Sequence, residues 1–136
     1  MPSVLDKYIV GRTLGKGAFA KVKLAQHSET GDQVAIKIML QDKGTSAEAE
    51  EAMKQIMNEV EKLASLQHNF ILNVVETAKE GVMKNDNGKQ KSVIYVVLEL
   101  APGGEMFDFL METGKFGEKL ARFYFRQMIE GVYHIH

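Results

Sequence analysis

Two short motifs on consecutive predicted strands constrain the fold of this chain more than any other feature. The first is a glycine turn, Leu14-Gly15-Lys16-Gly17-Ala18-Phe19-Ala20-Lys21-Val22, and the second is Val34-Ala35-Ile36-Lys37. Glycine has no side chain and tolerates positive φ, so such a turn lets backbone N–H groups approach a phosphate closely. Each motif alone is a weak signal, and an ordinary hairpin would explain the first. Together, in this order, they indicate a site for a nucleotide phosphate chain.

The second motif lies in a strand predicted over residues 33–39, and strand alternation assigns its side chains to two faces. One face carries Val34, Ile36 and Ile38. The other carries Ala35, Lys37 and Met39. Ala35 and Lys37 therefore face the same space, where a small residue leaves room for a flat ring and a lysine can reach its phosphates. A solvated lysine on a one-sided sheet is the alternative, but it leaves the glycine turn unexplained.

A half-buried lysine at this position needs a carboxylate partner. A helix is predicted over residues 45–66, where apolar residues recur at helical spacing and Thr45 with Glu48 fits a capping box. Glu59 and Glu61 border opposite edges of the apolar stripe. Position on the helix therefore leaves both glutamates as candidates for the partner.

Further elements follow from periodicity and turn chemistry. Strands are predicted over 8–15, around 22–24, and over 71–82 and 92–100, in addition to 33–39. The sequence Asn85-Asp86-Asn87-Gly88 suits a hairpin turn. Pro102-Gly103-Gly104 breaks the strand pattern, and helices are predicted over 105–111 and 118–136.

Composition excludes several classes of function. The 136 residues carry a formal net charge of -1, which gives no electrostatic case for nucleic acid or an anionic membrane as a partner. The absence of cysteine removes disulfides, thiolate metal sites and thiol nucleophiles. The start of the sequence has no apolar signal core, so we expect an intracellular, cytoplasmic protein.

These motifs, with three further segments, resemble the N-terminal part of a eukaryotic protein kinase domain. The resemblance covers nearly the whole chain and is closest to the serine/threonine kinases of the calmodulin-dependent and AMP-activated group. The segments that carry it are 59–69 (EVEKLASLQHN), 97–110 (VLELAPGGEMFDFL) and 121–136 (ARFYFRQMIEGVYHIH). It implies an α+β fold, with a kinase N-lobe and hinge over 1–101 and the start of the C-lobe over 102–136. The N-lobe would be a five-stranded antiparallel sheet with one main helix, and the C-lobe segment would supply its first two helices.

The same resemblance assigns site residues. The spacing from Glu59 to His68 selects Glu59 over Glu61 as the catalytic ion-pair partner of Lys37. Leu98 would be the gatekeeper beside the adenine ring, with the backbone of Glu99 and Ala101 at the adenine edge and Glu105 at the ribose. The residues assigned to ATP are Leu14, Gly15, Lys16, Gly17, Ala18, Phe19, Ala20, Val22, Ala35, Lys37, Leu98, Glu99, Ala101 and Glu105.

The expected activity follows from the same resemblance. The parent function would be ATP-dependent phosphorylation of serine or threonine in a protein substrate, with ATP and Mg²⁺ as cofactors. The family's catalytic loop and metal ligands should come after His136, so we assign no metal ligand within the chain and expect no transfer by it alone. Ala20 departs from the family pattern, which has a third glycine there.

The sequence leaves two other functions to consider and predicts one further property. A non-catalytic kinase-fold scaffold or pseudokinase fragment is the main alternative. A dinucleotide-binding oxidoreductase is disfavoured because it needs a helix directly after the glycine turn, whereas residues 21–26 alternate as a strand. The helix predicted over 118–136 has an apolar face formed by Leu120, Tyr124, Met128, Val132 and Ile135. We expect this face to self-associate or to require a partner.

Overall fold

The computed structural model describes residues 2–18, 20–39 and 47–136. The chain divides into two compact units, one formed by residues 1–65 with 74–100 and the other by residues 66–73 with 101–136. The chain crosses between the units more than once, because the segment after the first helix belongs to the second unit.

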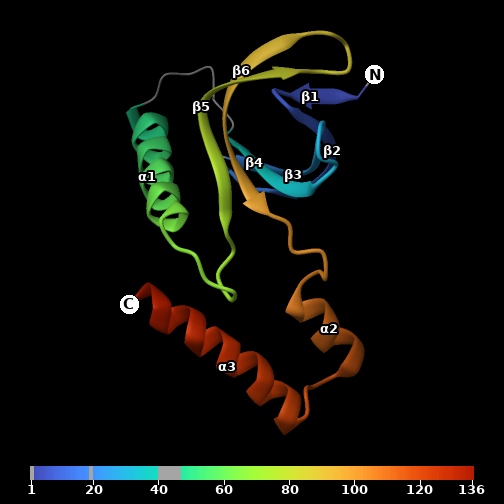
Figure 1. Ribbon diagram of the computed structural model, residues 1–136, viewed down its shortest axis with the longest axis vertical. Helices are drawn as coiled ribbons and strands as arrows, with labels where there is room; N and C mark the ends of the chain where they lie inside the picture. Colours follow the sequence, from blue (N-terminus) through green and yellow to red (C-terminus); the bar gives the residue numbers. More distant parts are fainter. Residues whose placement is uncertain (1, 19, 40–46) are drawn as a thin grey trace. The chain divides into compact units, whose positions relative to one another are not determined.

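The first unit is an antiparallel sheet with one helix beside it (Figure 1). Its strands are β1 (Ser3–Leu5), β2 (Tyr8–Lys16), β3 (Ala20–His27), β4 (Gln33–Met39), β5 (Val74–Lys84) and β6 (Gln90–Glu99). They follow the order β1-β2-β3-β4-β6-β5, and β5 pairs back onto β1, so the sheet closes on itself. Helix α1 (Ala47–Ala64) packs against β5.

The prediction of a five-stranded sheet is corrected by β1. The five expected strands are present, with small shifts at their ends, but a sixth precedes them. Leu5 pairs with Tyr8 of β2 on one side and with Met83 of β5 on the other, and its side chain is fully buried. A strand of three residues is too short to show a periodicity, so the sequence pattern did not reveal it.

Strand alternation divides the apolar side chains of the sheet into two clusters, as expected for β4. The first cluster contains Val34, Ile36 and Ile38 with Leu5, Tyr8, Val10, Ala25, Val93, Tyr95 and Val97. The second contains Met39, Ala20 and Val96, with Ile56, Val60, Val74, Ile94 and Leu98 packed against it. Because Ile56 and Val60 belong to α1, the second cluster is the one that holds the helix on the sheet.

Two expectations about local structure have different outcomes. The hairpin turn at Asn85–Gly88 is confirmed, since the Gly88 N–H donates to the Asn85 carbonyl at 2.9 Å and Gly88 has a φ of 82°. Glycine suits that left-handed angle because it has no Cβ. Thr45, which the predicted capping box requires, lies outside the described residues.

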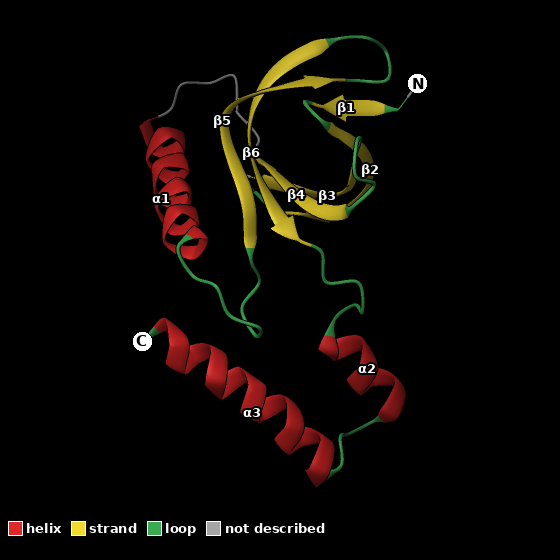
Figure 2. Cartoon of the chain, in the orientation of Figure 1, coloured by secondary structure: helices red, strands yellow, loops and turns green. Residues whose placement is uncertain are grey.

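The second unit contains α2 (Met106–Thr113) and α3 (Glu118–Ile135), joined by a short loop (Figure 2). Gly131 of α3 is buried against the segment 66–73, where a Cβ would lie 3.1 Å from the Phe70 carbonyl oxygen. The His68 and His134 rings lie 4.8 Å apart by their centroids, so this segment and the end of α3 pack together. Across the described ranges, no helix has the length and apolarity needed to cross a membrane.

A polar group on β5 is held by the start of the chain. Glu76 accepts hydrogen bonds from the Tyr8 hydroxyl at 2.6 Å and from the Lys7 ammonium at 3.0 Å. Burial opposes ionisation of Glu76, but these two hydrogen bonds and the positive charge of Lys7 outweigh it, so the pKa of Glu76 lies below its ordinary value. Burial, together with the hydrogen bond to Glu76, raises the pKa of Tyr8.

The lowered pKa of Glu76 predicts a specific dependence of stability on pH. The stabilisation by this carboxylate is complete above the pKa of glutamate in the unfolded chain, about 4.3, and is lost as pH falls through the lower pKa of the folded state. The free energy of unfolding should therefore fall less steeply below about pH 4.3 in Glu76→Gln than in the unmodified chain. Denaturant unfolding at several pH values measures the slopes. Glu80→Gln, at an exposed position of the same strand, is the control, and equal slopes for both variants would contradict the assignment.

Candidate functional site

The glycine turn joins β2 to β3 and is open on its outer side. Gly15 pairs with Val22 across the hairpin, and the Gly17 N–H donates to the Ala20 carbonyl at 2.8 Å. A Cβ built on Gly15 would meet no heavy atom within 4 Å, so space is available beside the backbone there. Leu14, Lys16 and Ala18 are exposed. Phe19, which the sequence assigned to ATP, lies outside the described residues.

Ala20 has a structural role that the sequence pattern did not indicate. Its side chain is 8% exposed and lies opposite Met39 in the second apolar cluster. In the sequence, Ala20 is visible only as a departure from the third glycine of the turn pattern. In the structure its methyl group belongs to the packing beneath the turn, so contact with a phosphate would have to come from its backbone.

Four of the residues assigned to ATP share one face of the sheet. Lys37 on β4 lies directly opposite Val22 on β3 and Val96 on β6. Ala35 lies opposite Leu98 in the same way. Directly opposed residues of antiparallel strands point to the same face, so Val22, Ala35, Lys37 and Leu98 lie together. Lys37, Val22 and Leu98 are half-buried and Ala35 is buried, so this face carries apolar side chains beside one lysine.

The structure does not join Lys37 to Glu59. Glu59 is exposed on α1, and none of the ion pairs in the described part of the chain includes it or Lys37. The competing glutamate, Glu61, lies 3.9 Å from the ammonium of Lys79 on β5. The Lys37–Glu59 pair therefore remains a prediction.

The remaining assigned residues lie at the end of β6 and beyond it. Leu98 is half-buried and packs against the second apolar cluster, and Glu99 is exposed where β6 ends. Ala101 and Glu105 are exposed and belong to the second unit. The strand residues of the predicted site thus lie within the first unit. Ala101 and Glu105 belong to the second unit and are described only within it.

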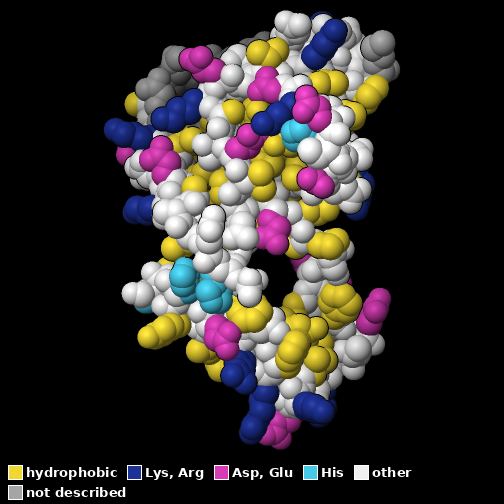
Figure 3. All heavy atoms as spheres, in the orientation of Figure 1, with side chains coloured by type: hydrophobic (Ala, Val, Ile, Leu, Met, Phe, Trp, Pro, Cys, Tyr) yellow, Lys and Arg dark blue, Asp and Glu magenta, His cyan; other side chains and the backbone are white. Residues whose placement is uncertain are grey.

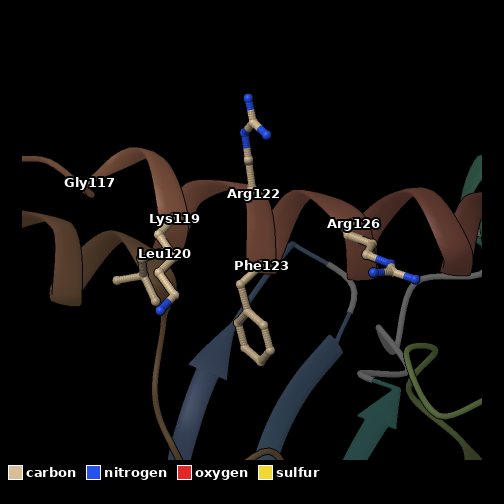
Figure 4. Close-up of a pocket in the computed structure, with 6 residues that line it drawn as sticks. All are labelled: Gly117, Lys119, Leu120, Arg122, Phe123 and Arg126. Carbon is tan, nitrogen blue, oxygen red and sulfur yellow. The ribbon is translucent and has the colours of Figure 1, made fainter.

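A hollow of about 610 Å³ lies elsewhere, along the first half of α3 (Figure 4). It is lined by Gly117, Lys119, Leu120, Arg122, Phe123 and Arg126. Arg122 points away from Phe123, and it pairs with Glu118 at 2.7 Å. Arg126 pairs with Glu130 at 3.3 Å. The two guanidinium charges are thus compensated on the helix itself, and the hollow includes none of the residues assigned to ATP.

The hydroxyls of two buried tyrosines form hydrogen bonds with carboxylates across the sheet, and the sequence patterns did not predict them. Asp6 and Glu76 each accept a hydrogen bond from a tyrosine hydroxyl, at 2.7 Å from Tyr95 and 2.6 Å from Tyr8. A tyrosine in an apolar strand is a signal that could have found them, because a buried hydroxyl usually has a partner. Among the described residues, no group of three histidine, aspartate or glutamate side chains could hold a metal ion.

Comparison with known proteins identifies relatives for nearly the whole chain. The sequence model of the protein kinase domain matches residues 8–136. CBL-interacting serine/threonine-protein kinase 24 of Arabidopsis thaliana is 38% identical over 97% of this chain and 27% of its own length. SNF1-related protein kinase catalytic subunit alpha KIN12, also of Arabidopsis thaliana, is 40% identical over 98% of this chain and 24% of its own length. The chain thus spans about a quarter of the length of these relatives.

The packing of Ala20 predicts that restoring the family's glycine will weaken the fold. Ala20→Gly removes a buried methyl group and adds backbone freedom to a strand, so the free energy of unfolding should fall by about 1 kcal/mol. Ala18→Gly, at an exposed position of the same turn, should change it by less than about 0.5 kcal/mol. Urea denaturation measures both, and equal stability of Ala20→Gly and the unmodified chain would contradict the packing role.

Proposed function

This chain belongs to the protein kinase domain family, and on that premise we propose that it is the ATP-binding part of a protein serine/threonine kinase. One observation carries the proposal. Lys37, Val22, Ala35 and Leu98 lie on one face of the sheet, on β3, which follows the open glycine turn, and on the next strands β4 and β6. An apolar surface with one cation fits a nucleotide, because the base is flat and apolar while the phosphates carry negative charge.

The residues present fit ATP as follows. The backbone around Gly15 and Gly17 would approach the phosphates, since a Cβ at Gly15 meets nothing and one at Gly17 would meet only the Ala20 carbonyl oxygen, at 3.7 Å. Lys37 would bind a phosphate oxygen, and Ala35 with Leu98 would contact the base. ATP supplies the phosphoryl group and Mg²⁺ neutralises its charge when they are bound. We propose that the metal ligands and the catalytic base come from residues beyond this chain.

A protein substrate is the corresponding proposal for the acceptor. One of the two relatives is named as a serine/threonine-protein kinase, and the proposal transfers this specificity to the longer protein that would contain the chain. The chain alone would bind nucleotide weakly and transfer no phosphoryl group. In this reaction positioning and electrostatic stabilisation supply nearly all of the catalysis, and the groups that provide most of them would be absent.

A non-catalytic scaffold is the second candidate, and one observation favours it. Lys37 and Glu59 form no ion pair in the described part of the chain, whereas Glu61 is engaged with Lys79 of β5. Active kinases need the corresponding lysine–glutamate pair in place. A chain that binds protein partners through a kinase fold would not need it, and would show no response to nucleotide.

Nucleotide binding separates the two candidates. Titration of the 136-residue chain with Mg-ATP in a calorimeter should show binding, and Lys37→Ala should weaken it at least tenfold, or about 1.4 kcal/mol, through the loss of the cation. Lys89→Ala, in the exposed β5–β6 turn, should bind like the unmodified chain. The same samples should transfer no phosphate from ATP to serine or threonine peptides. Absence of binding would favour the scaffold, and transfer abolished by Lys37→Ala would show that the chain is catalytic by itself.

The second unit exposes apolar side chains that we propose drive self-association of this chain. Hydrophobic side chains gather on the part of the surface formed by α2 and α3 (Figure 3). On α3, Leu120, Met128, Val132 and Ile135 are between 42% and 55% exposed. Contiguous apolar surface of this kind favours contact with another protein or with a second copy of the chain. The concentration of the chain therefore decides whether this contact forms.

Replacing two of these side chains with glutamate should reverse self-association. Met128 and Val132 lie four residues apart, one turn along the same helix face, so Met128→Glu with Val132→Glu places charge on adjoining positions. In sedimentation velocity, the unmodified chain should form dimers or larger species as its concentration rises, and the double variant should remain monomeric. Lys115→Glu, in the exposed loop before α3, is the control. A monomeric unmodified chain at high concentration would contradict the proposal.

A further inference from the structure

The first residues of the chain lie outside the family match, but they form a strand of the sheet. The protein kinase model begins at residue 8, whereas β1 spans Ser3–Leu5. Leu5 is fully buried in the first apolar cluster, and β1 pairs with β5 at Met83 and Lys84. Residues 3–8 are called the N-terminal clamp below, because they hold β5 at two places.

The first place is the end of β5 that leads into the hairpin turn. The Asp6 N–H donates to the Val82 carbonyl at 3.1 Å, and its carboxylate accepts the Val82 N–H at 3.0 Å and the Tyr95 hydroxyl at 2.7 Å. Asp6 adopts a φ of 49°, a left-handed angle that aspartate tolerates better than most residues. A single side chain thus binds both strands of the hairpin.

Gly81 lies next to the contacts that Asp6 makes, and a larger residue would not fit there. A Cβ at residue 81 would clash with the Tyr95 ring and would lie 3.3 Å from the Asp6 carboxylate. Only glycine lets the Tyr95 ring cross β5 at this point and present its hydroxyl to Asp6. The register of β5 on β6 shifts between Ala78 and Gly81, so the strand is locally irregular where the clamp holds it.

The second place is Glu76, nearer the start of β5. Its two carboxylate oxygens accept hydrogen bonds from Tyr8 and Lys7, at 2.6 Å and 3.0 Å. The side chains of Lys7 and Glu76 are 49% and 31% exposed, so the charge pair is screened by water, while the tyrosine hydrogen bond is partly buried. The clamp therefore engages β5 on both sides of residues 77–81.

Helix α1 contacts β5 both within and before the stretch that the clamp encloses. Lys79, which pairs with Glu61 of α1, lies between Glu76 and Val82, and Val74 packs in the cluster that also contains Ile56 and Val60. Ile56 and Val60 of α1 also pack on the second apolar cluster, and β5 adds Val74 and the Lys79–Glu61 pair to these contacts. A displacement of β5 would accordingly be passed on to α1.

We propose that the N-terminal clamp positions α1, and with it Glu59, by holding β5. Asp6 and Tyr8 are then positioning residues that act through β5 and touch no nucleotide. The role of Glu59 rests on the proposed function, in which it pairs with Lys37. The effect of the clamp on the position of α1 does not depend on nucleotide and is tested without it.

Hydrogen exchange in the 136-residue chain tests the control of α1. Asp6→Asn with Tyr8→Phe removes a charge and one hydroxyl while keeping the size of both side chains. Amide exchange should become about tenfold faster over residues 74–84 and 51–64, the change expected when hydrogen bonds to charged groups are lost. Exchange over 20–27 and 33–39 should stay within about twofold. Asp86→Asn with Tyr133→Phe, at exposed positions, is the matched control and should alter none of these rates.

Spin labels give a second and direct measurement of the helix position. The chain has no cysteine, so Lys62→Cys on α1 and Gln33→Cys at the start of β4 introduce a single pair of labels at exposed sites. The distance distribution between them should shift or broaden in the Asp6→Asn, Tyr8→Phe background and stay unchanged in the control background. If that background fails to fold, Tyr8→Phe alone carries the same comparison.

The outcomes are distinct. Faster exchange in β5 with unchanged exchange and label distances in α1 would overturn the inference, because the clamp would then hold the strand without positioning the helix. A uniform increase over all strands would overturn it too, since that indicates lower global stability. If Mg-ATP fails to bind while the clamp variants move α1 as expected, the proposed function fails and the control of α1 stands.

Discussion

The alternation of side chains along β4 is the constraint on which the rest of the first unit depends. Each residue of β4 faces one of two environments, and both neighbouring strands are in register with it. Val34, Ile36 and Ile38 enter a closed apolar core, which fixes that face and thereby forces the intervening residues to the opposite one. Ala35 and Lys37 face the α1 side of the sheet for this reason. A shift of one residue would bury the lysine and dismantle the site.

The strands and the shared face of the site could be predicted because they rest on local, periodic signals. The bounds of β4 match the predicted 33–39, and the two faces separate as alternation requires. The hairpin turn before Lys89 followed from the conformational preferences of asparagine and glycine. These features depend on residues close in sequence, so one sequence suffices to find them.

The features that could not be predicted depend on contacts between distant residues. β1 is three residues long and gains its place only by pairing with β5, some eighty positions away. The bond from Tyr95 to Asp6 joins residues 89 positions apart. Ala20 appeared as a departure from a glycine pattern, and its packing against Met39 became visible only in the sheet. The orientation of Glu59 belongs to the same class, because it depends on how α1 packs on the sheet.

The central claim is that a nucleotide binds beside the glycine turn, on the face of β4 that bears Ala35 and Lys37. The most direct test is to titrate the chain with Mg-ATP and to record which backbone amide NMR signals shift. The account predicts that shifts in the first unit will concentrate at residues 14–22, 35–37 and 98–99. Shifts confined to residues 117–126, where a hollow lies along the start of α3, would contradict it, because that hollow shares no residue with the face described. Shifts confined to the first apolar cluster would contradict it equally.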